Sequence, residues 1–330
     1  MIRLSRPWRV ALAAAAVACF TLTGCSPSGE EPADTAAQQG GFPRTVSHAM
    51  GETTVERKPA RVAALDSSYV DAALALETEV VAYTKYPSSD GLPGYLGDDA
   101  RFAKGGRVVG ELSSPDVEAL YDAAPDLIVS ARIRHESIYR ELSNVAPTVF
   151  SETTGATWKD NIRLLAKALG KERLAEEKIG AYERRAKAIG EAIRAKHGRM
   201  PTYSLVRFIE GEPTVRLYTS NSFPGIVMSD VGLQRPQGQP DSQDDIAVDL
   251  SQEQIGKLDA DRVFVSSYAD ATQQAEDPRA MFQSNPLWGT LKGAIGDVDD
   301  ETWYVSVSLQ GAHAMLDDIA RQFGVDPARG

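Results

Sequence analysis

The clearest pattern along the chain is a helical repeat of apolar positions between Lys171 and Gly198. His197, Gly198 and Pro201 supply a basic last turn, a C-cap glycine and a proline stop. We therefore predict one long amphipathic helix over 171–198, flanked by α/β segments of similar length and joining two lobes. Its apolar positions recur three or four residues apart between charged ones, namely Leu174, Ile179, Tyr182, Ala186, Ile189 and Ile193.

Short apolar runs separated by helical segments fill the part of the chain before this helix. This alternation predicts βα units with a mainly parallel sheet, and a ligand crevice at the carboxyl ends of its strands. The expected strands are 61–65, 79–84, 108–110, 126–131 and 147–150. The loops after them hold Ser67, Ser68, Tyr69, Tyr83, Tyr86, Arg132, Arg134 and His135.

A similar alternation follows the long helix. Strands are expected at 203–209, 215–219, 262–268 and 303–307, the first two as a hairpin across 210–214. Asn221-Ser222 is expected to cap a helix over 223–231, and a closing helix is expected over 313–323.

An internal repeat connects the two segments. Residues 116–120 followed by 126–129 match residues 251–255 followed by 261–264 at a constant offset of 135 residues. Each copy places a glutamate, Glu118 or Glu253, at the second position of a capped helix that precedes a strand. Two such lobes around a helical strut would form a cleft, although a match over so few residues is also compatible with chance.

The N-terminus has the features of an export signal. Arg3, Arg6 and Arg9 precede an apolar run over 10–22, which is too short and wrongly flanked for a membrane span. The following Leu-Thr-Gly-Cys resembles a bacterial lipobox, which predicts lipidation of Cys25 after removal of residues 1–24. Ordinary signal cleavage with an incidental Cys25 is the alternative. Residues 25–43, mostly Ser, Gly, Glu, Pro, Ala and Gln, are expected to form a flexible tether.

Charge and motifs narrow the function classes. Residues 1–24 contain three arginines and no acid, so their removal takes the formal net charge from −11 to −14, which argues against a nucleic-acid partner. No cysteine follows Cys25, so no disulfide is expected. Phosphate-loop, dinucleotide, G-x-S-x-G and H-E-x-x-H patterns are missing from the sequence, and its four histidines share no metal-ligand spacing.

Over nearly all of its length, the mature chain resembles the iron-siderophore solute-binding lipoproteins of bacterial ABC importers. This group also includes vitamin B12 and haem binders. The matching stretches are 61–77, 114–131, 158–170, 285–288 and 316–319. The resemblance implies a class III periplasmic-binding-protein fold, in which two Rossmann-like lobes, 44–170 and 199–330, are joined by one rigid helix with the ligand cleft between them. It also implies only a modest closing motion.

The resemblance further implies partners and a location. Glu118 and Glu253 match the glutamates with which this family docks onto arginines of the membrane permease. The alternative is that each merely complements its helix dipole, an effect of about 0.3–1 kcal/mol. We expect a monomeric, non-enzymatic binding protein, extracytoplasmic and held on the cell membrane through its lipid anchor.

A ferric siderophore carries iron already saturated by oxygen donors, so the protein needs no metal ligands and no cofactor. It needs cationic donors for those oxygens and aromatic walls for the organic shell. Arg207 is the first candidate, because a charge inside an apolar strand is costly unless it faces a cleft or meets an acid. Related binders often carry an Arg-Phe pair at 207–208 and an Arg-His pair at 134–135. The candidate ligand-binding residues are Arg207, Arg216, Arg134, Trp303, Tyr86, Tyr218, Tyr268, Phe223 and Ser68.

Arginines with neutral aromatic walls favour a hydroxamate or mixed citrate-hydroxamate ligand. Haem, which would want an axial Tyr or His, and vitamin B12, which would need fewer cations, remain alternatives. A bare metal ion is disfavoured without a cluster of His, Asp and Glu. A lipid-anchored hydrolase stays open, with Ser67, Ser68 or Ser130 as nucleophile and His135 as the nearest base. A receptor that only senses its ligand also stays open.

Overall fold

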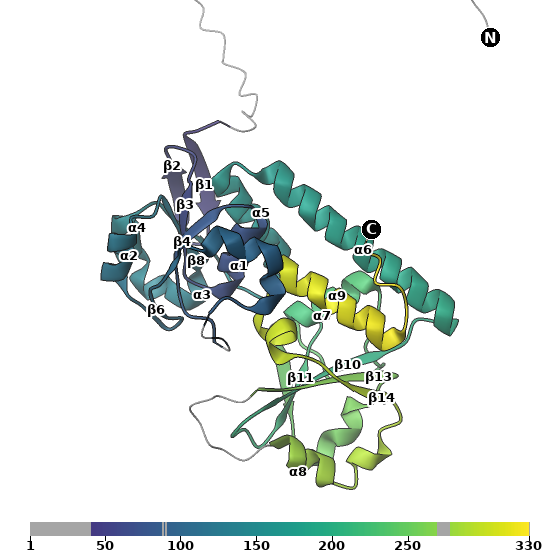
Figure 1. Cartoon of the computed structure of the whole chain (residues 1–330). Coiled ribbons are helices and arrows are strands. Elements are labelled where there is room, and N and C mark those ends of the chain that lie inside the picture. Colours follow the sequence, from purple (N-terminus) through teal and green to yellow (C-terminus); the bar gives the residue numbers. More distant parts are fainter. Residues whose placement is uncertain (1–40, 88, 90, 269–277, 330) are drawn as a thin grey trace, which may run out of the picture. The chain divides into compact units, whose positions relative to one another are not determined.

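Apolar strands in the first part of the chain form a five-stranded parallel sheet, the first sheet, in the computed structural model (Figure 1). Its spatial order is β5 (Arg107–Val108), β4 (Glu79–Tyr83), β3 (Arg61–Ala64), β8 (Leu127–Ala131) and β9 (Thr148–Ser151). Two antiparallel hairpins accompany it, β1 (Arg44–His48) with β2 (Gly51–Val55) and β6 (Gly110–Glu111) with β7 (Ser114–Pro115). The mainly parallel sheet expected from the sequence is confirmed.

A second five-stranded sheet follows the long helix. Its order is β12 (Ala247–Leu250), β11 (Val215–Tyr218), β10 (Tyr203–Ile209), β13 (Arg262–Tyr268) and β14 (Ala294–Asp297). The β10–β11 hairpin predicted from the sequence is present, and β10, β13 and β14 run parallel. The carboxyl ends of these three strands therefore meet at one edge of this second sheet.

Helices account for most of the remaining described chain. The α-helices are α1 (Ser67–Ala75), α2 (Val117–Ala123), α3 (Arg132–His135), α4 (Tyr139–Val145), α5 (Trp158–Leu169), α6 (Glu172–His197), α7 (Phe223–Val231), α8 (Pro278–Ser284) and α9 (Leu309–Phe323). The 3-10 helices are η1 (Gly94–Ala103), η2 (Glu136–Ile138), η3 (Gln252–Leu258) and η4 (Trp288–Thr290), and η5 (Glu301–Val305) is a π-helix.

The structure describes residues 41–87, 89, 91–268 and 278–329, and they belong to one compact unit, 40–330. The predicted signal peptide, the lipidation site Cys25 and most of the predicted tether lie outside the described residues. Within the described part of the chain, no helix combines the length and apolar character needed to cross a membrane.

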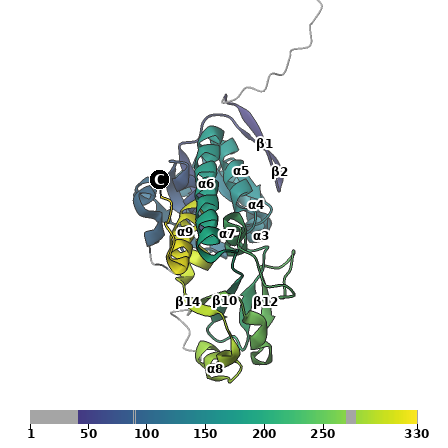
Figure 2. The same ribbon diagram turned by 90° about the vertical axis from the view of Figure 1, so that its right-hand side faces the viewer.

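Helix α6 confirms the long helix predicted over 171–198, and its buried face belongs to a core shared by both sheets. One cluster of buried residues includes Val62 of the first sheet, Ile189 of α6 and Phe264 of the second sheet. Helix α9 lies beside α6 (Figures 1 and 2) and also packs on α1 of the first sheet. The closing helix thus starts at Leu309, earlier than predicted, and bridges to the first part of the chain.

Gly190 marks a close approach between α6 and α7. A Cβ atom at this position would lie 1.9 Å from the carbonyl oxygen of Val231 at the end of α7. We expect Gly190→Ala to lower the free energy of unfolding by about 1–3 kcal/mol, because the helices must move apart. Gly180→Ala is the matched control on the same helix, since its Cβ would meet only the tip of the Arg184 side chain at 3.2 Å.

Gly180→Ala should stabilise the protein by about 0.5–1 kcal/mol, the usual gain when alanine replaces a helix-interior glycine. Urea unfolding followed by circular dichroism measures both values. A Gly190→Ala variant as stable as Gly180→Ala would contradict the close approach of α6 and α7.

The strand predicted at 303–307 is wrong. These residues fall in and just after the π-helix η5 (Glu301–Val305), where Trp303 is fully buried. Its ring stacks on Phe264 at a centroid distance of 4.9 Å, and its indole N–H donates to Asp318 of α9. Aromatic and β-branched residues favour strands locally, and packing against α9 overrides that preference here.

Candidate functional site

Two arginines stand directly opposite each other on one face of the second sheet. Arg207 of β10 is paired in register with Arg216 of β11. Residues paired in this way point to the same face, and like charges there repel each other unless each has its own partner. On the opposite face, Val206 and Phe208 pack in a separate apolar cluster. Arg207 therefore continues the row of Tyr203 and Leu205 toward the carboxyl end of β10.

Arg207 is held by an acid that sequence reasoning did not identify. Its Nε donates to Oδ1 of Asp300 at 2.8 Å and its Nη2 donates to Oδ2 at 2.6 Å. Its Nη1 donates to the hydroxyl of Tyr218 at 3.1 Å. The Ser266 hydroxyl, on the neighbouring strand β13, also donates to Oδ1 of Asp300 at 2.8 Å. Arg207 thus pairs with an acid, which offsets the cost of placing its charge inside an apolar strand.

Two aromatic rings lie close to the guanidinium of Arg207. Its central carbon lies 5.1 Å from the ring centroid of Tyr268 and 5.3 Å from that of Tyr304. Burial by itself would lower the pKa of Arg207, but Asp300 and Tyr218 outweigh that effect and the pKa lies above its ordinary value. Arg207 thus stays charged, and the structure brings it together with two of the predicted tyrosines, Tyr218 and Tyr268.

Arg216 lies near this group but has a separate partner. Its Nε and Nη2 donate to the two carboxylate oxygens of Glu212, at 3.1 and 2.6 Å. About a third of each side chain is exposed. Arg216 is therefore a neutralised and more accessible neighbour of Arg207.

A second polar group lies at the carboxyl ends of β3 and β8 in the first sheet. Asp66 caps helix α1 and accepts hydrogen bonds from the backbone N–H and the hydroxyl of Ser68. Its other carboxylate oxygen accepts from Nε of Arg134 at 2.9 Å. The structure therefore brings the predicted residues Ser68 and Arg134 together through Asp66.

Arg134 borders a surface pocket of about 430 Å³. The pocket is lined by residues that follow β4 and β8 together with the β6–β7 turn, namely Lys85, Pro87, Glu111, Leu112, Ser113, Ile133 and Arg134. Two of these side chains are cationic, and the Arg134 side chain is 40% exposed. The pocket lies at the carboxyl edge of the first sheet, where a parallel sheet normally presents its ligand site.

Three predicted aromatic residues pack in the interior. Phe223 packs edge-on against Trp158, and Trp303 stacks on Phe264. The Tyr86 hydroxyl donates to Asp71 at 2.6 Å, and the side chain is 1% exposed. None of these three side chains offers a ligand an open surface, because aromatic residues here fill the core that both sheets share.

Of the three serines considered as a nucleophile, Ser130 does lie beside His135, but the pair is buried. The Ser130 hydroxyl lies 2.7 Å from Nδ1 of His135, while Nε2 lies 2.7 Å from the carbonyl oxygen of Leu112. Nε2 must donate to that carbonyl, so Nδ1 accepts from Ser130. Ser130 has no exposed surface, and burial lowers the pKa of His135. The arrangement is a satisfied pair of core polar groups.

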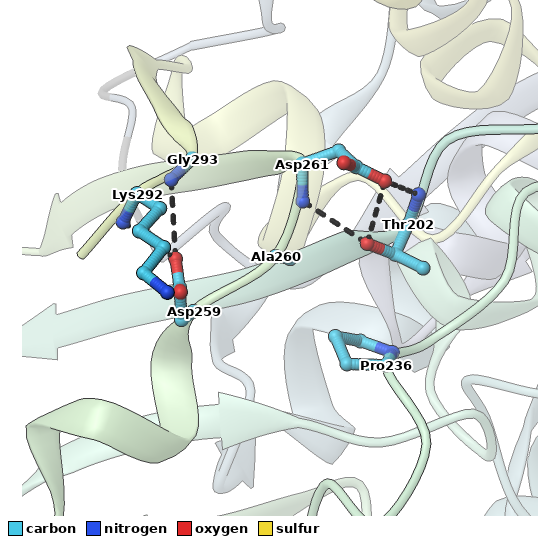
Figure 3. Close-up of a pocket in the computed structure, with 7 residues that line it drawn as sticks. All are labelled: Thr202, Pro236, Asp259, Ala260, Asp261, Lys292 and Gly293. Atoms are coloured by element: carbon cyan, nitrogen blue, oxygen red, sulfur yellow. Dashed lines mark hydrogen bonds between the residues drawn. The ribbon is translucent and has the colours of Figure 1, made fainter.

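Figure 3 shows a second pocket, at the edge of the second sheet opposite to the carboxyl ends of its parallel strands. Its volume is about 340 Å³. Its residues Thr202, Asp261 and Gly293 directly precede β10, β13 and β14, so it lies at the amino ends of these strands. Its two acids already have partners. Asp261 accepts from the backbone N–H and the hydroxyl of Thr202, and Asp259 accepts from the backbone N–H of Gly293. This pocket is therefore not at the ligand edge of the sheet.

No group of three or more His, Cys, Asp or Glu side chains able to hold a metal ion occurs among the described residues. Sequence reasoning missed Asp66, Asp300 and Tyr304. The sequence did contain one signal for Asp66, which follows a predicted strand directly. Asp300 and Tyr304 gave none, because Tyr304 lies in the segment 303–307 that was wrongly predicted as a strand and Asp300 lies just before it.

Glu118 and Glu253 occupy matching places, as the internal repeat predicts. Each is the second residue of a helix, α2 or η3. The Asp116 side chain caps α2 by accepting from the backbone N–H of Ala119, and at the start of η3 the Gln254 side chain accepts from the backbone N–H of Ser251. The strands that follow these helices occupy corresponding places in the two sheets, β8 beside β3 and β13 beside β10. Both glutamates are exposed, and across the described ranges neither forms an ion pair.

Comparison with known proteins gives consistent matches. Residues 62–295 match the family model described as periplasmic binding protein. The probable siderophore-binding lipoprotein YfiY of Bacillus subtilis is 34% identical over 93% of this chain and 95% of that protein. The Fe(3+)-citrate-binding protein YfmC of the same organism is 26% identical over 93% and 94%. The crystal structure of Staphylococcus aureus SirA complexed with staphyloferrin B matches with a TM-score of 0.78 and 26% identity, covering 86% of this chain and 99% of that chain.

Proposed function

Because the chain belongs to the periplasmic binding protein family, a family of binding proteins rather than enzymes, we propose that it captures a ferric siderophore outside the cytoplasm and delivers it to an ABC importer. The relatives named for siderophore and Fe(3+)-citrate binding support the ligand class. Lipidation at Cys25 would hold the protein on the membrane, and Glu118 and Glu253 would dock onto the permease. The protein acts as a monomer in this proposal.

The observation that carries the proposal is the guanidinium of Arg207 close to the rings of Tyr268 and Tyr304, toward the carboxyl edge of the second sheet. A cation beside aromatic faces suits a ligand that combines anionic oxygens with an organic shell. Arg134 and the pocket beside it would form the corresponding wall on the first sheet. Hydroxamate or mixed citrate-hydroxamate ligands fit this set of groups best, and the iron would be held by the siderophore alone.

We expect Arg207→Ala to weaken binding of a ferric hydroxamate at least about tenfold, because the change removes one charge-assisted contact and leaves Asp300 buried without its partner. Quenching of tryptophan fluorescence in the chain from residue 40 onward measures this affinity. The panel contains ferric hydroxamates, ferric catecholates, ferric citrate, haem and cobalamin.

The outcomes of this titration separate the alternatives. Quenching by haem or cobalamin alone would keep the fold and overturn the ligand, whereas a failure of every compound to bind would overturn the proposed function. Arg199→Ala is the matched control, because Arg199 forms a similar two-bond pair with Asp261 at the amino edge of the same sheet. It should bind every compound as the wild type does.

A further inference from the structure

We propose that Asp300 determines which net charge of ferric ligand the site accepts, by occupying the edge of Arg207 that a ligand carboxylate would otherwise bind. This inference rests on the proposed function and adds a specificity-determining residue to it. Asp300 acts through Arg207, so it is a positioning residue rather than a ligand contact.

The geometry of the pair supports this role. The carboxylate of Asp300 accepts two parallel hydrogen bonds, from Nε of Arg207 at 2.8 Å and from Nη2 at 2.6 Å. This is the arrangement in which arginine binds carboxylates in general, including those of ligands. The hydroxyl of Ser266 holds Asp300 in place from β13. Asp300 therefore stands where an incoming carboxylate would bind most strongly.

Because the Asp300–Arg207 pair is buried, it makes the site sensitive to the net charge of the ligand. Arg207 is 9% exposed, and its positive charge is balanced by a carboxylate whose side chain is 12% exposed. An anionic ligand must displace Asp300 or bring a second negative charge to an already neutral, desolvated pair. A neutral ferric complex meets neither cost. Of the two ligand classes proposed above, the wild-type site should therefore prefer neutral ferric hydroxamates to citrate-hydroxamates, whose ferric complexes carry net negative charge.

Tyr304 indicates that ligand contacts remain possible beside this pair. Its ring lies against Arg207 and the residue is 8% exposed, while its hydroxyl is buried and has no hydrogen-bond partner within the described residues. A buried hydroxyl left without a partner is costly, and a ligand oxygen would satisfy it once the Tyr304 side chain moves enough to expose it. A neutral ferric complex can thus bind beside Arg207 while Asp300 stays paired.

Asp300→Asn tests the inference with two ligands that differ in charge. Three hydroxamate anions neutralise the ferric ion, whereas ferric citrate carries net negative charge. We expect Asp300→Asn to raise the affinity for ferric citrate about tenfold and to change that for a neutral ferric trihydroxamate less than about twofold. Asp261→Asn removes a similar arginine–aspartate pair at the amino edge of the same sheet and should change neither affinity.

Two further variants keep the test decisive. Ser266→Ala loosens Asp300 without removing its charge, and should shift selectivity in the same direction by about two- to threefold even if Asp300→Asn folds poorly. In an Arg207→Ala background, Asp300→Asn can help ferric citrate only by relieving repulsion, so a gain there as large as in the wild-type background would overturn the inference. Equal changes for both ligands would also overturn it. Failure of wild type to bind either ligand would instead overturn the hydroxamate and citrate-hydroxamate ligand class of the proposed function.

Discussion

Iron uptake is expected to be abolished when Glu118 and Glu253 are both replaced by arginine, while the affinity for the ferric siderophore stays within about twofold of wild type. Both side chains are exposed at the second position of a capped helix. If they contact arginines of the permease, the variant places like charges against each other, which costs several kcal/mol across an interface. Uptake of radioactive iron by cells and fluorescence titration of the purified protein measure the two effects separately.

Matched control changes separate docking from a simple loss of helix stability. Glu141 and Asp160 are exposed acids in the first turns of α4 and α5. Replacing both with arginine costs a similar interaction with the helix dipoles, about 0.3–1 kcal/mol each. The control variant should transport normally. If it also lost uptake, or if the Glu118 and Glu253 variant lost ligand affinity to the same degree, the docking role would be refuted.

The elements that could be predicted from sequence are those whose signal is local. The apolar repeat of α6, the apolar strand around Arg207 and the cap at Ser222 each have their sequence signal within neighbouring residues, and all three are present in the structure. The single charge inside that apolar strand also identified Arg207 as unusual. Periodicity and capping are enough for these because neighbouring residues determine them.

The partners of these residues could not be predicted in the same way. Asp300 lies 93 positions along the chain from Arg207, so their pairing depends on how the sheet and η5 pack together. Tyr86 and Trp303 failed as surface candidates for a related reason. The sequence does not distinguish an aromatic residue in the core from one in a ligand site. Only the packing of α1, α9 and the second sheet shows which of the two it is.

A pH dependence of stability is expected from Asp71, a carboxyl without exposed surface on α1. Burial raises its pKa to about 7, despite opposing hydrogen bonds from Tyr86, Ser308 and Tyr95. In the unfolded chain the ordinary value is 3.8. The folded state therefore favours the protonated form, so this stabilisation is full below about pH 4 and is lost as the pH rises through about 7. The linked change is on the order of 4 kcal/mol.

Asp71→Asn should remove this dependence, because the amide resembles the protonated carboxyl and does not ionise. Its unfolding free energy relative to wild type should thus rise between about pH 4 and pH 8 by up to about 4 kcal/mol, measured by urea unfolding across that range. The exposed Asp122→Asn should follow the wild-type curve. Parallel curves for wild type and Asp71→Asn would contradict the raised pKa. Asp71 also matters beyond stability, because its backbone carbonyl accepts a hydrogen bond from the side chain of Gln310 on α9. Ionisation of Asp71 therefore acts where α9 packs against α1.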